Sequence, residues 1–537
     1  MEPREVRSGG REGDEYFERA VATLTETQRR AVESPSRALC IVAGAGSGKT
    51  RALTLRVARR VRDGSAEADH IAVCTFTRKA AHELRQRLRL YGVEVSRPAS
   101  TGGAPGPGVR AGTIHQLALT LLRRHASDAG DAPPVVADDR FRILRGIVGE
   151  PAAASVADTE IGWAKARCLT PDSYAGAARD AGRSAGATIE QVAEVFASYE
   201  ATLRRRRALD LDDVLVHAAD LIHDDGAFAE GVRWRYRHLS VDEFQDVNPA
   251  QFRLVRALLG SGDDVCAVGD PNQAIYGWNG ADPRLLARLP EMVPGMEVVR
   301  LDDNHRSTPQ VVAAATAALG RSTTAPPRSA VADGPMPVVT TYDDDDDEVS
   351  GIVARLQGHR DDGRPWSEEA VLARTNDQLS TVARALARAG IPHRIAPGPE
   401  SPADESGPGR AGPVGPAGST GVDDAVELAT FHRAKGLQWA SVCVVGLEDG
   451  FVPIVHARSP EARAEERRLV YVALTRASRD LHCSWARVRR MGGGRRMERQ
   501  PSPWLAAVAR VSRTGEGRPT PRSAGDQIAE IRAGLNR

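Results

Sequence analysis

The sequence has few of the features that mark membrane, metal-binding or disulfide-stabilised proteins. It contains no apolar run of about 18 residues, which excludes a membrane-spanning helix. The polar N-terminus lacks the apolar core of a secretory signal. The 6 cysteines include no Cys-x-x-Cys pair, which disfavours a zinc site or a disulfide framework. We therefore expect a cytoplasmic protein whose cysteines are small buried side chains.

Lysine is also scarce. Lysine and arginine together number 72, yet lysine occurs only at Lys49, Lys79, Lys165 and Lys435. Where so arginine-rich a chain keeps a lysine, the choice indicates a compact point charge that a planar guanidinium cannot replace. The formal net charge is +1, which excludes a global field that attracts nucleic acid but allows a local basic groove.

The 537 residues are enough for three or four domains. Strand-like and helix-like runs alternate over residues 21–119 and 206–295, which predicts a first α/β lobe with a parallel sheet. Residues 120–205 are rich in Ala, Arg and Leu and predict a helical insertion in this lobe. A second α/β lobe is expected over residues 296–395 and 422–486.

The remaining segments are polar or of low complexity. We expect a flexible leader over residues 1–20 and a flexible Gly/Pro-rich linker over 396–421. Residues 487–537 are interpreted as a C-terminal tail with a short helix at PSPWLAAVARV and disordered polar residues. The acidic run at 343–348 is most simply a solvated loop before a helix, which we prefer to a metal site.

The clearest motif is AGAGSGKT, residues 43–50. It matches GxxxxGK[ST], follows the apolar run ALCIV and precedes a helical run, which is the setting that a P-loop requires and a chance glycine turn lacks. Glycines let backbone N–H groups close around phosphates at a helix N-terminus. Lys49 is expected to bridge the β- and γ-phosphates and Thr50 to hold Mg²⁺. The nucleotide-binding residues expected in this segment are Gly44, Ala45, Gly46, Ser47, Gly48, Lys49 and Thr50.

Two acids at the end of a later strand-like run, LSVDEFQD, form the expected catalytic partner of this loop. Asp242 is expected to bind Mg²⁺ through water, and Glu243 to polarise the attacking water. The alternative, that both acids cap the next helix, is less favoured beside a P-loop. Kinases, GTPases, transporters and translocases share these features, so they alone establish only the hydrolysis or transfer of a nucleoside triphosphate.

Further segments narrow the class because of their order. They are LTETQRRAV (24–32), TFTRKAAHELRQRL (75–88), GTIHQLAL (112–119), VDEFQDVNPAQ (241–251), VGDPNQAIYGWNGA (268–281), LDDNHRST (301–308), TFHRAKGLQW (430–439) and EERRLVYVALTRA (465–477). This series resembles the UvrD/Rep/PcrA family of superfamily 1 DNA helicases from about residue 20 to about residue 485. The resemblance implies two RecA-like lobes, the use of ATP and Mg²⁺, and movement from 3′ to 5′ along single-stranded DNA.

The resemblance assigns four more residues to the nucleotide. It implies that Gln28 reads the adenine and that Gln273 senses the γ-phosphate from the first lobe. Arg306 and Arg476 resemble arginine fingers supplied by the second lobe, rather than members of surface ion pairs. Guanidinium groups neutralise charge on the γ-phosphoryl oxygens, so hydrolysis would require the cleft to close, which couples chemistry to motion.

A DNA path is also implied. Aromatic residues make up only 4% of the chain, so Tyr276 and Trp278 are notable for their spacing in a Gly-rich loop. This spacing favours base stacking, worth roughly 1–3 kcal/mol per base, over anchoring in the core. No segment resembles a recognition helix, so sequence-specific readout is not expected. The positions that the resemblance assigns to DNA are Thr75, Phe76, Thr113, His115, Tyr276, Trp278, Thr430 and His432.

Three positions depart from the family pattern. His305 stands where tyrosine is usual, which puts the stacking on adenine in doubt. Gln438 replaces a glutamate and leaves the expected ribose contact in doubt, and Asn279 replaces a common arginine. The interval between AVLARTN and TFHRAKGL holds mainly the Gly/Pro-rich linker, so the usual second-lobe accessory domain is expected to be missing.

The leading hypothesis is a DNA-stimulated ATPase that unwinds DNA in repair or replication. Its expected partners are single-stranded DNA and single-strand/double-strand junctions, with a repair protein as a candidate partner. The main alternative is a translocase that displaces proteins from DNA with little intrinsic unwinding. A DNA-binding protein with a decayed ATPase site is disfavoured by the intact P-loop and acids. The TFHRAKGL and VYVALTRA segments disfavour a P-loop kinase or a transporter ATPase.

Overall fold

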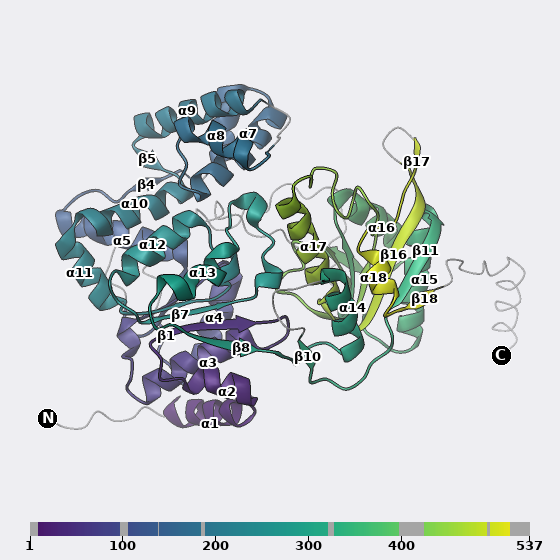
Figure 1. Cartoon of the computed structure of the whole chain (residues 1–537), viewed down its shortest axis with the longest axis horizontal. Coiled ribbons are helices and arrows are strands. Elements are labelled where there is room, and N and C mark those ends of the chain that lie inside the picture. The colour runs from purple at the N-terminus through teal and green to yellow at the C-terminus, as the bar shows by residue number, and fades with distance from the viewer. Residues whose placement is uncertain are drawn as a thin grey trace, which may run out of the picture. The chain divides into compact units, whose positions relative to one another are not determined.

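The computed structural model describes residues 9–96, 106–137, 139–183, 188–320, 327–396, 424–490 and 495–515. These residues form two compact units, each a sheet flanked by helices (Figure 1). The first unit comprises residues up to 305 together with 327–328, and the second comprises the other described residues. The expected pair of RecA-like α/β lobes is confirmed.

The first unit is built on a parallel sheet in the order β3-β2-β6-β7-β1-β8. Alternate residues of β1 serve opposite faces, because Cys40 belongs to one apolar core while Leu39 and Ile41 belong to the other. A strand covered by helices on both faces must be apolar throughout, as ALCIVA is. The strands are β1 (Ala38–Ala43), β2 (Ile71–Thr75), β3 (Arg110–Thr113), β6 (His238–Val241), β7 (Val265–Gly269) and β8 (Glu297–Leu301).

Helices cover both faces of this sheet. The four helices α1 to α4 contribute to the core that contains Leu39, and the other helices surround the core that contains Cys40. The helices are α1 (Gly9–Ala22), α2 (Glu26–Glu33), α3 (Lys49–Arg62), α4 (Arg78–Leu90), α5 (Ile114–Ala129), α10 (Leu211–Asp224), α11 (Gly226–Arg235), α12 (Pro249–Leu259) and α13 (Arg284–Met292). Short 3₁₀ turns occur at η1 (Ala68–His70), η2 (Phe244–Asp246), η3 (Pro271–Gln273) and η4 (Gly277–Asn279).

The prediction of a flexible leader over residues 1–20 is wrong for the described residues, because these form α1. Phe17 and Val21 are buried in the same core as β1. Their spacing of four residues places both on one face of the helix. The apolar side chains are few, and the polar residues around them conceal this pattern in the sequence.

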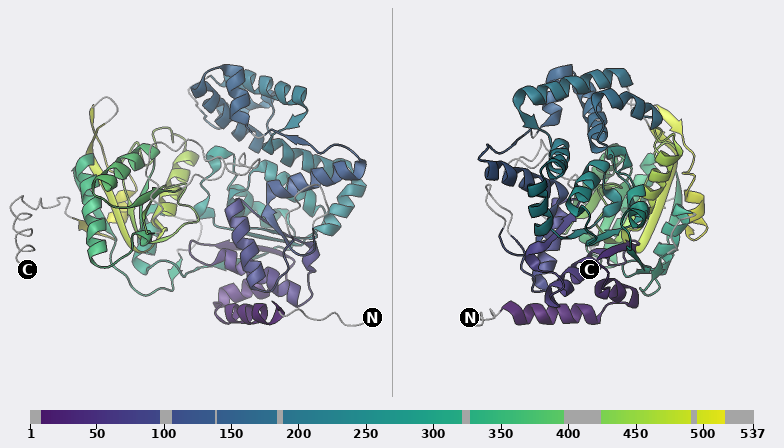
Figure 2. Two further views of the ribbon diagram at one scale, coloured as in Figure 1. Left: turned by 180° about the vertical axis from the view of Figure 1, so that it is seen from behind. Right: turned by 60° about the vertical axis from the view of Figure 1, so that its left-hand side comes forward.

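The helical insertion of the first lobe is confirmed. Its helices form a separate layer with their own core, which contains Trp163, Tyr174 and Phe196 (Figure 2). The predicted start at residue 120 is too early, because α5 continues past it and packs Leu121 into the core of the lobe. The elements of the insertion are β4 (Val135–Val136), α6 (Arg140–Val148), α7 (Pro151–Ala166), α8 (Pro171–Asp180), α9 (Ile189–Arg206) and β5 (Ala208–Leu209).

The second unit is built on a sheet in the order β13-β14-β12-β15-β16-β11-β18, with β17 antiparallel to β16. All the other pairings in this sheet are parallel. Its strands are β11 (Val338–Asp344), β12 (Glu369–Ala373), β13 (His393–Ile395), β14 (Val426–Thr430), β15 (Trp439–Val444), β16 (Ala477–Arg490), β17 (Arg496–Glu498) and β18 (Arg513–Gly515). Its helices are α14 (Pro309–Leu319), α15 (Asp345–Asp361), η5 (Trp366–Glu368), α16 (Asn376–Arg388), α17 (Pro460–Leu474) and α18 (Leu505–Ala509). The short strands β9 (Asp303–Asn304) and β10 (Arg328–Ser329) lie where the chain passes between units.

The predicted start of the second lobe at residue 296 is wrong. Strand β8 pairs in parallel with β1 and therefore belongs to the first sheet. It buries Val299 and Leu301 in the core of the first unit. This burial stabilises β8 at the edge of the first sheet, where it covers β1. The chain enters the second unit only at Arg306.

The predicted tail over residues 487–537 is also wrong up to Gly515. The short helix is present as α18, and it buries Leu505 and Val508. Strand β18 then pairs in parallel with β11 and extends the second sheet. The polar side chains of β17 and β18 suggested a tail, but their backbone groups are paired with neighbouring strands.

The acidic run at 343–348 is not a solvated loop. It spans the end of β11 and the first turn of α15, where carboxylates interact favourably with the helix dipole. Glu348 is buried and pairs with Arg489. The predicted linker over 396–421 lies outside the described residues, apart from Ala396. None of the helices in the described ranges is long and apolar enough to cross a membrane.

Candidate nucleotide and DNA sites

The P-loop connects the end of β1 to the start of α3. Gly46 and Gly48 have φ of 72° and 78°, in the left-handed region that favours glycine. A Cβ atom at Gly48 would lie 2.9 Å from Nε2 of Gln28, so the close approach also requires glycine. Gly48 caps α3 without a side-chain hydrogen bond, which leaves a helix N-terminus suited to an anion.

Gln28 is held against this loop. The side chain is buried, and its Nε2 donates to the carbonyl of Ser47 at 2.8 Å. Its Oε1 accepts from the backbone N–H of Thr25 at 3.2 Å, which completes a capping box at the start of α2. Within the loop, Ser47 Oγ donates to the carbonyl of Gly44 at 2.8 Å. Gln28 therefore supports the P-loop, and its contact with adenine stays a prediction.

The two acids lie directly after β6 and face the first turn of α3. Thr50 Oγ1 donates to Asp242 Oδ2 at 2.9 Å, and Lys49 Nζ lies 3.1 Å from Glu243 Oε2. Burial raises the pKa of Asp242 to about 6, and the charge of Glu243 acts in the same direction. A hydroxyl beside a carboxylate is the hard oxygen pair that Mg²⁺ prefers, so these residues fit the expected ion.

The backbone of Glu243 is strained. Its φ of 54° lies in the left-handed region, which is costly for a residue with a Cβ atom. Such strain is maintained only where the surroundings fix it, and it is often found at functional sites. Here it directs the carboxylate toward Lys49.

Two further residues of this site were missed in the sequence. Gln245 is fully buried, and its Nε2 donates to Glu243 Oε2 at 2.5 Å while its Oε1 accepts from the N–H of Asp270 at 2.9 Å. Asp270 in turn accepts from Gln273 Nε2 at 2.6 Å. Polar residues directly after apolar strands were the available signal. A chain of hydrogen bonds therefore joins Glu243 to the expected γ-phosphate sensor.

Strand β9 and the residue after it supply a third support that the sequence did not reveal. Asn304 is buried, and its Nδ2 donates to the carbonyl of Ala45 at 2.8 Å. The backbone N–H of His305 donates to the carbonyl of Gly46 at 2.9 Å, while its imidazole is exposed. Asn304 and His305 of the LDDNHRST segment therefore hold two carbonyl groups of the P-loop in place within the first unit.

The expected nucleotide residues are divided between the units. The structure brings Gln28, Lys49, Thr50, Asp242, Glu243 and Gln273 together in the first unit. Arg306, Gln438 and Arg476 belong to the second unit, where Gln438 is exposed. The buried guanidinium of Arg476 donates to the carbonyls of Val472 at 2.9 Å and Leu437 at 3.1 Å. These bonds hold Arg476 firmly within its own unit.

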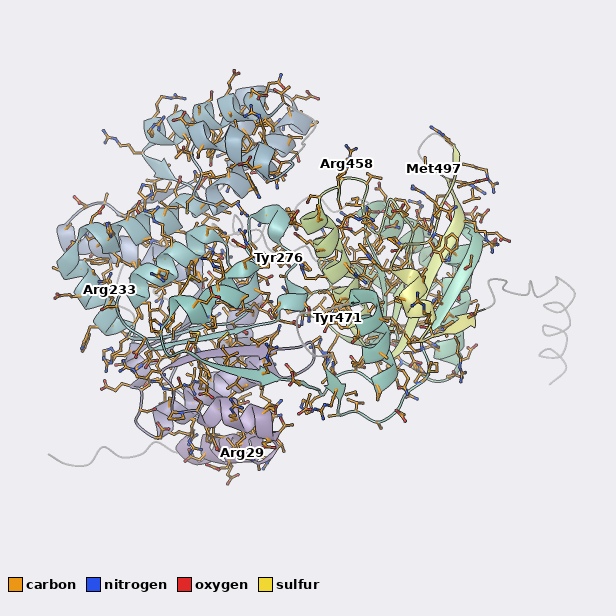
Figure 3. The ribbon with its side chains drawn as sticks, in the orientation of Figure 1. Arg29, Arg233, Tyr276, Arg458, Tyr471 and Met497 are labelled. Atoms are coloured by element: carbon orange, nitrogen blue, oxygen red, sulfur yellow. The ribbon has the colours of Figure 1, made fainter. Side chains whose placement is uncertain are left out.

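Aromatic side chains converge beside the ends of β2 and β7. The rings of Phe76 and Tyr276 stack with centroids 5.2 Å apart and planes 18° from parallel. Tyr276 lies in the segment between β7 and α13 (Figure 3). Trp278, two residues on, is 48% exposed, and the buried hydroxyl of Thr75 has no hydrogen-bond partner. An exposed indole next to a stacked pair is a surface on which bases can stack.

Thr113, His115 and Thr430, which are also expected to contact DNA, are buried. Thr113 Oγ1 accepts from the N–H of Gln116 and caps α5, and His115 follows in its first turn. In the second unit, Thr430 Oγ1 accepts from the N–H of Arg433 at 3.4 Å. The DNA contacts of these three residues stay predictions.

His432 lies close to Thr430 in the chain, in the second unit. Burial lowers the pKa of His432 to about 3, and the positive charges of Arg374 and Lys435 act in the same direction. The imidazole is therefore neutral near pH 7. Its N–H can donate a hydrogen bond to a phosphate oxygen, but the neutral ring cannot form an ion pair with it.

The cysteines agree with the expectation of buried thiols, except for one. All are free, and Cys168 is exposed whereas the others are buried. Asn279, which stands where the family often has arginine, is also exposed. Its N–H donates to the carbonyl of Tyr276 at 3.0 Å.

Comparison with known proteins agrees with this arrangement. Residues 24–294 match the UvrD/REP helicase N-terminal domain. Residues 299–398 and 417–488 match the UvrD-like helicase C-terminal domain. The first match contains the P-loop, the paired acids and the aromatic segment, and the second contains Arg306 and Arg476.

Named relatives span both units. The chain is 35% identical over 584 aligned residues to the ATP-dependent DNA helicase UvrD2 of Mycobacterium tuberculosis, covering 92% of this chain and 82% of that protein. It is 31% identical over 386 residues to DNA helicase II of Escherichia coli and 32% identical over 397 residues to the ATP-dependent DNA helicase PcrA of Leuconostoc citreum. These alignments cover 70% and 71% of this chain but only 51% of each relative. With both domains matched across the two lobes, the chain belongs to the UvrD/Rep/PcrA family of superfamily 1 DNA helicases.

Proposed function

We propose that this protein is an ATP-dependent DNA helicase that moves from 3′ to 5′ along single-stranded DNA and opens duplex at single-strand/double-strand junctions. One observation carries the proposal. Hydrogen bonds run from Glu243 through Gln245 and Asp270 to Gln273, and Tyr276 follows three residues later in the same segment. Glu243, the proposed general base, and the aromatic residues proposed to bind DNA therefore lie in one connected part of the first unit.

ATP and Mg²⁺ fit the P-loop and its acids. The backbone N–H groups of 44–48 and the ammonium of Lys49 would hold the phosphates, and Thr50 with Asp242 would hold the ion. Bound MgATP supplies the phosphoryl group whose transfer to water releases the free energy for movement. Glu243 would then accept a proton from the attacking water, once Lys49 pairs with phosphate instead of its carboxylate.

Two arginines of the second unit complete this proposal. Arg306 follows directly on His305, whose N–H bonds to the carbonyl of Gly46, so the chain itself keeps Arg306 close to the P-loop. Arg476 donates to carbonyls of its own unit, so it would approach or leave a nucleotide together with that unit. Hydrolysis would then require closure, and product release would allow reopening, which converts chemistry into motion.

DNA would lie across the aromatic surface and the neighbouring strand ends. Phe76 and Tyr276 present stacked rings and Trp278 presents an exposed indole, so these residues would stack on bases without reading their sequence. In the second unit, the neutral His432 would donate a hydrogen bond to a DNA phosphate. Binding would depend on salt through basic residues that contact phosphates.

Repair or replication is the cellular setting that we propose, with a repair protein as a candidate partner. A second candidate function is a translocase that displaces proteins and unwinds poorly alone. It is favoured by the short interval between β13 and β14, residues 396–425, where the C-terminal family match is also interrupted. Segments below about 40 residues rarely fold alone, so this interval has no room for an independent accessory domain.

The test of the main proposal is ATP hydrolysis with and without single-stranded DNA. We expect DNA to stimulate the wild-type rate strongly and Lys49→Ala to abolish hydrolysis under both conditions. If adding DNA left the wild-type rate of ATP hydrolysis unchanged, the proposal of a DNA motor would be refuted. Unwinding of a 3′-tailed duplex at a rate matching translocation, by the protein alone, would refute the partner-dependent alternative.

A further inference from the structure

Lys165 is the one lysine outside the P-loop and the segments that carry the family resemblance. It lies on α7 of the helical insertion and is only 7% exposed. Its Nζ lies 2.8 Å from Glu200 Oε1, 2.9 Å from Asp210 Oδ2 and 2.7 Å from Asp213 Oδ1. A buried ammonium needs such compensation, because unpaired charge in the interior is costly.

The carboxylates around Lys165 come from both the insertion and the lobe. Glu200 lies on α9 of the insertion, whereas Asp210 caps α10, whose Val214 and Leu215 pack into the core of the lobe. The hydroxyl of Tyr199 also donates to Asp210 Oδ2, at 2.9 Å. Lys165 therefore ties α7 to the helix that anchors the insertion on the lobe.

The residue after Lys165, Ala166, touches residues 274–281, the aromatic segment that carries Tyr276 and Trp278. A Cβ atom at Gly280 would lie 2.6 Å from Cβ of Ala166 and 3.3 Å from the carbonyl oxygen of Trp163. Gly280 has a φ of 94°, and its N–H donates to the carbonyl of Gly277 at 3.0 Å. The turn that carries Tyr276 and Trp278 thus rests without a gap on the C-terminal end of α7.

The cluster explains why lysine is retained here. Three carboxylate oxygens, one from α9 and two from the N-terminal cap and first turn of α10, converge on one atom, which a tetrahedral ammonium with three N–H donors can satisfy. A planar guanidinium presents its donors in a fixed fork that suits coplanar oxygens. The convergence fixes the position of α7 as well as neutralising charge.

We propose that Lys165 is a positioning residue for DNA binding: it holds the end of α7 against Gly280 and so sets Tyr276 and Trp278 for base stacking. This inference rests on the proposed function, because it assumes that the aromatic segment binds single-stranded DNA. It assigns to the helical insertion a role in the geometry of the DNA surface of the lobe.

The test compares Lys165→Met with wild type in ATP hydrolysis as single-stranded DNA is titrated. We expect the DNA concentration for half-maximal stimulation to rise about tenfold, the equivalent of one lost base stack. The rate without DNA and the rate at saturating DNA should stay within about twofold of wild type, because the P-loop and its acids are untouched.

Arg60→Met provides the matched control. Arg60 is a partly buried cation of the same unit, with a side chain 17% exposed, and it pairs with Asp264 at 2.7 Å and 2.8 Å, at the opposite ends of the strands from the P-loop. We expect this variant to lose stability with no change in the half-maximal DNA concentration. Equal shifts in both variants would overturn the proposal, since they would reflect general destabilisation.

Ala166→Val tests the same contact without altering the charge cluster. The larger side chain should press on Gly280 and raise the half-maximal DNA concentration. Hydrogen exchange of residues 274–281 should accelerate in Lys165→Met and in Ala166→Val. If Lys165→Met fails to fold, Ala166→Val alone decides the test. The proposal is overturned if Ala166→Val has the same half-maximal DNA concentration as the wild type. A wild-type protein that DNA does not stimulate contradicts the proposed function itself, which is a separate result.

Discussion

At the scale of single residues, a hydrogen bond and an ion pair join the P-loop to the two acids. Lys49 lies beside Glu243, Thr50 donates to Asp242, and Gln245 donates to the carboxylate of Glu243. The hydrogen bond from Gln245 Nε2 holds the carboxylate of Glu243 in place, and polar groups held in place reduce the reorganisation that catalysis requires. Glu243, the proposed general base, is therefore distinguished by its contacts as well as by its motif.

We predict that Glu243→Gln abolishes most hydrolysis and leaves ATP binding intact. The amide keeps the size of the side chain but cannot accept a proton, and general base catalysis is worth roughly 10²- to 10⁴-fold in rate. The measurement is the DNA-stimulated ATPase rate beside equilibrium binding of a fluorescent ATP analogue. A variant with more than about a tenth of the wild-type rate would show that another group is the base.

A second residue-scale prediction concerns Asp264. Burial alone would raise the pKa of Asp264, but hydrogen bonds from Arg60 and His238 outweigh it and hold the pKa below its ordinary value of 3.8. Because the folded pKa lies below the unfolded one, the ionised carboxylate stabilises the fold above pH 3.8 and this stability is lost as pH falls through the folded pKa.

Asp264→Asn should therefore lower the free energy of unfolding by about 3 kcal/mol at pH 7, as expected when a buried ion pair is broken. The difference from wild type should shrink steadily below pH 4. Urea unfolding followed at a series of pH values provides the measurement. A difference that grows as pH falls would show the opposite sign of linkage.

At the scale of helices and strands, much of the architecture could be predicted. The P-loop, the paired acids and the helical insertion were recognisable because glycine spacing, acid placement and helical periodicity are local signals. The roles of Gln245, Asp270 and Asn304 were not, since their partners lie elsewhere in the chain and only the fold brings them together.

The boundaries were the weakest part of the sequence analysis. The sequence predicts β8 in the second lobe because nothing local records that its partner is β1. It predicts flexible ends at α1, where polar side chains outnumber the few buried apolar ones, and at β18, which has no apolar side chain and is held by backbone pairing with β11. In each case a contact with a distant part of the chain determines the structure of the segment, and the local sequence pattern does not show that contact.

An element-scale prediction follows for α18. Leu505→Asp places a charge at a buried position of the second unit and should lower the free energy of unfolding by about 3 kcal/mol or more. Ala509→Asp introduces the same charge at an exposed position of the same helix and should have little effect. Thermal unfolding of both variants is the measurement. Equal melting temperatures would mean that α18 does not contribute to the fold.

At the scale of the whole molecule, the residues proposed for ATP hydrolysis come from both units. The phosphate loop and the acids belong to the first, and the two proposed arginine fingers belong to the second. We predict that Arg306→Ala lowers the hydrolysis rate about 10³-fold or more while ATP still binds, because a finger acts on charge that develops during the reaction. Arg476→Lys should behave similarly, since an ammonium lacks the planar fork.

Arg458→Ala is the control for these variants. It removes an exposed arginine of the same unit (Figure 3) and should hydrolyse ATP at the wild-type rate. Steady-state hydrolysis at saturating DNA, together with ATP-analogue binding, gives the comparison. A wild-type rate in Arg306→Ala would remove this residue from the catalytic site.

Movement is the central claim, and release of streptavidin from biotin-tagged single-stranded DNA measures it most directly. A motor that travels from 3′ to 5′ should displace streptavidin from the 5′ end in the presence of ATP, leave it on the 3′ end, and do neither as Lys49→Ala. Equal release from both ends, or release without ATP, would contradict the account.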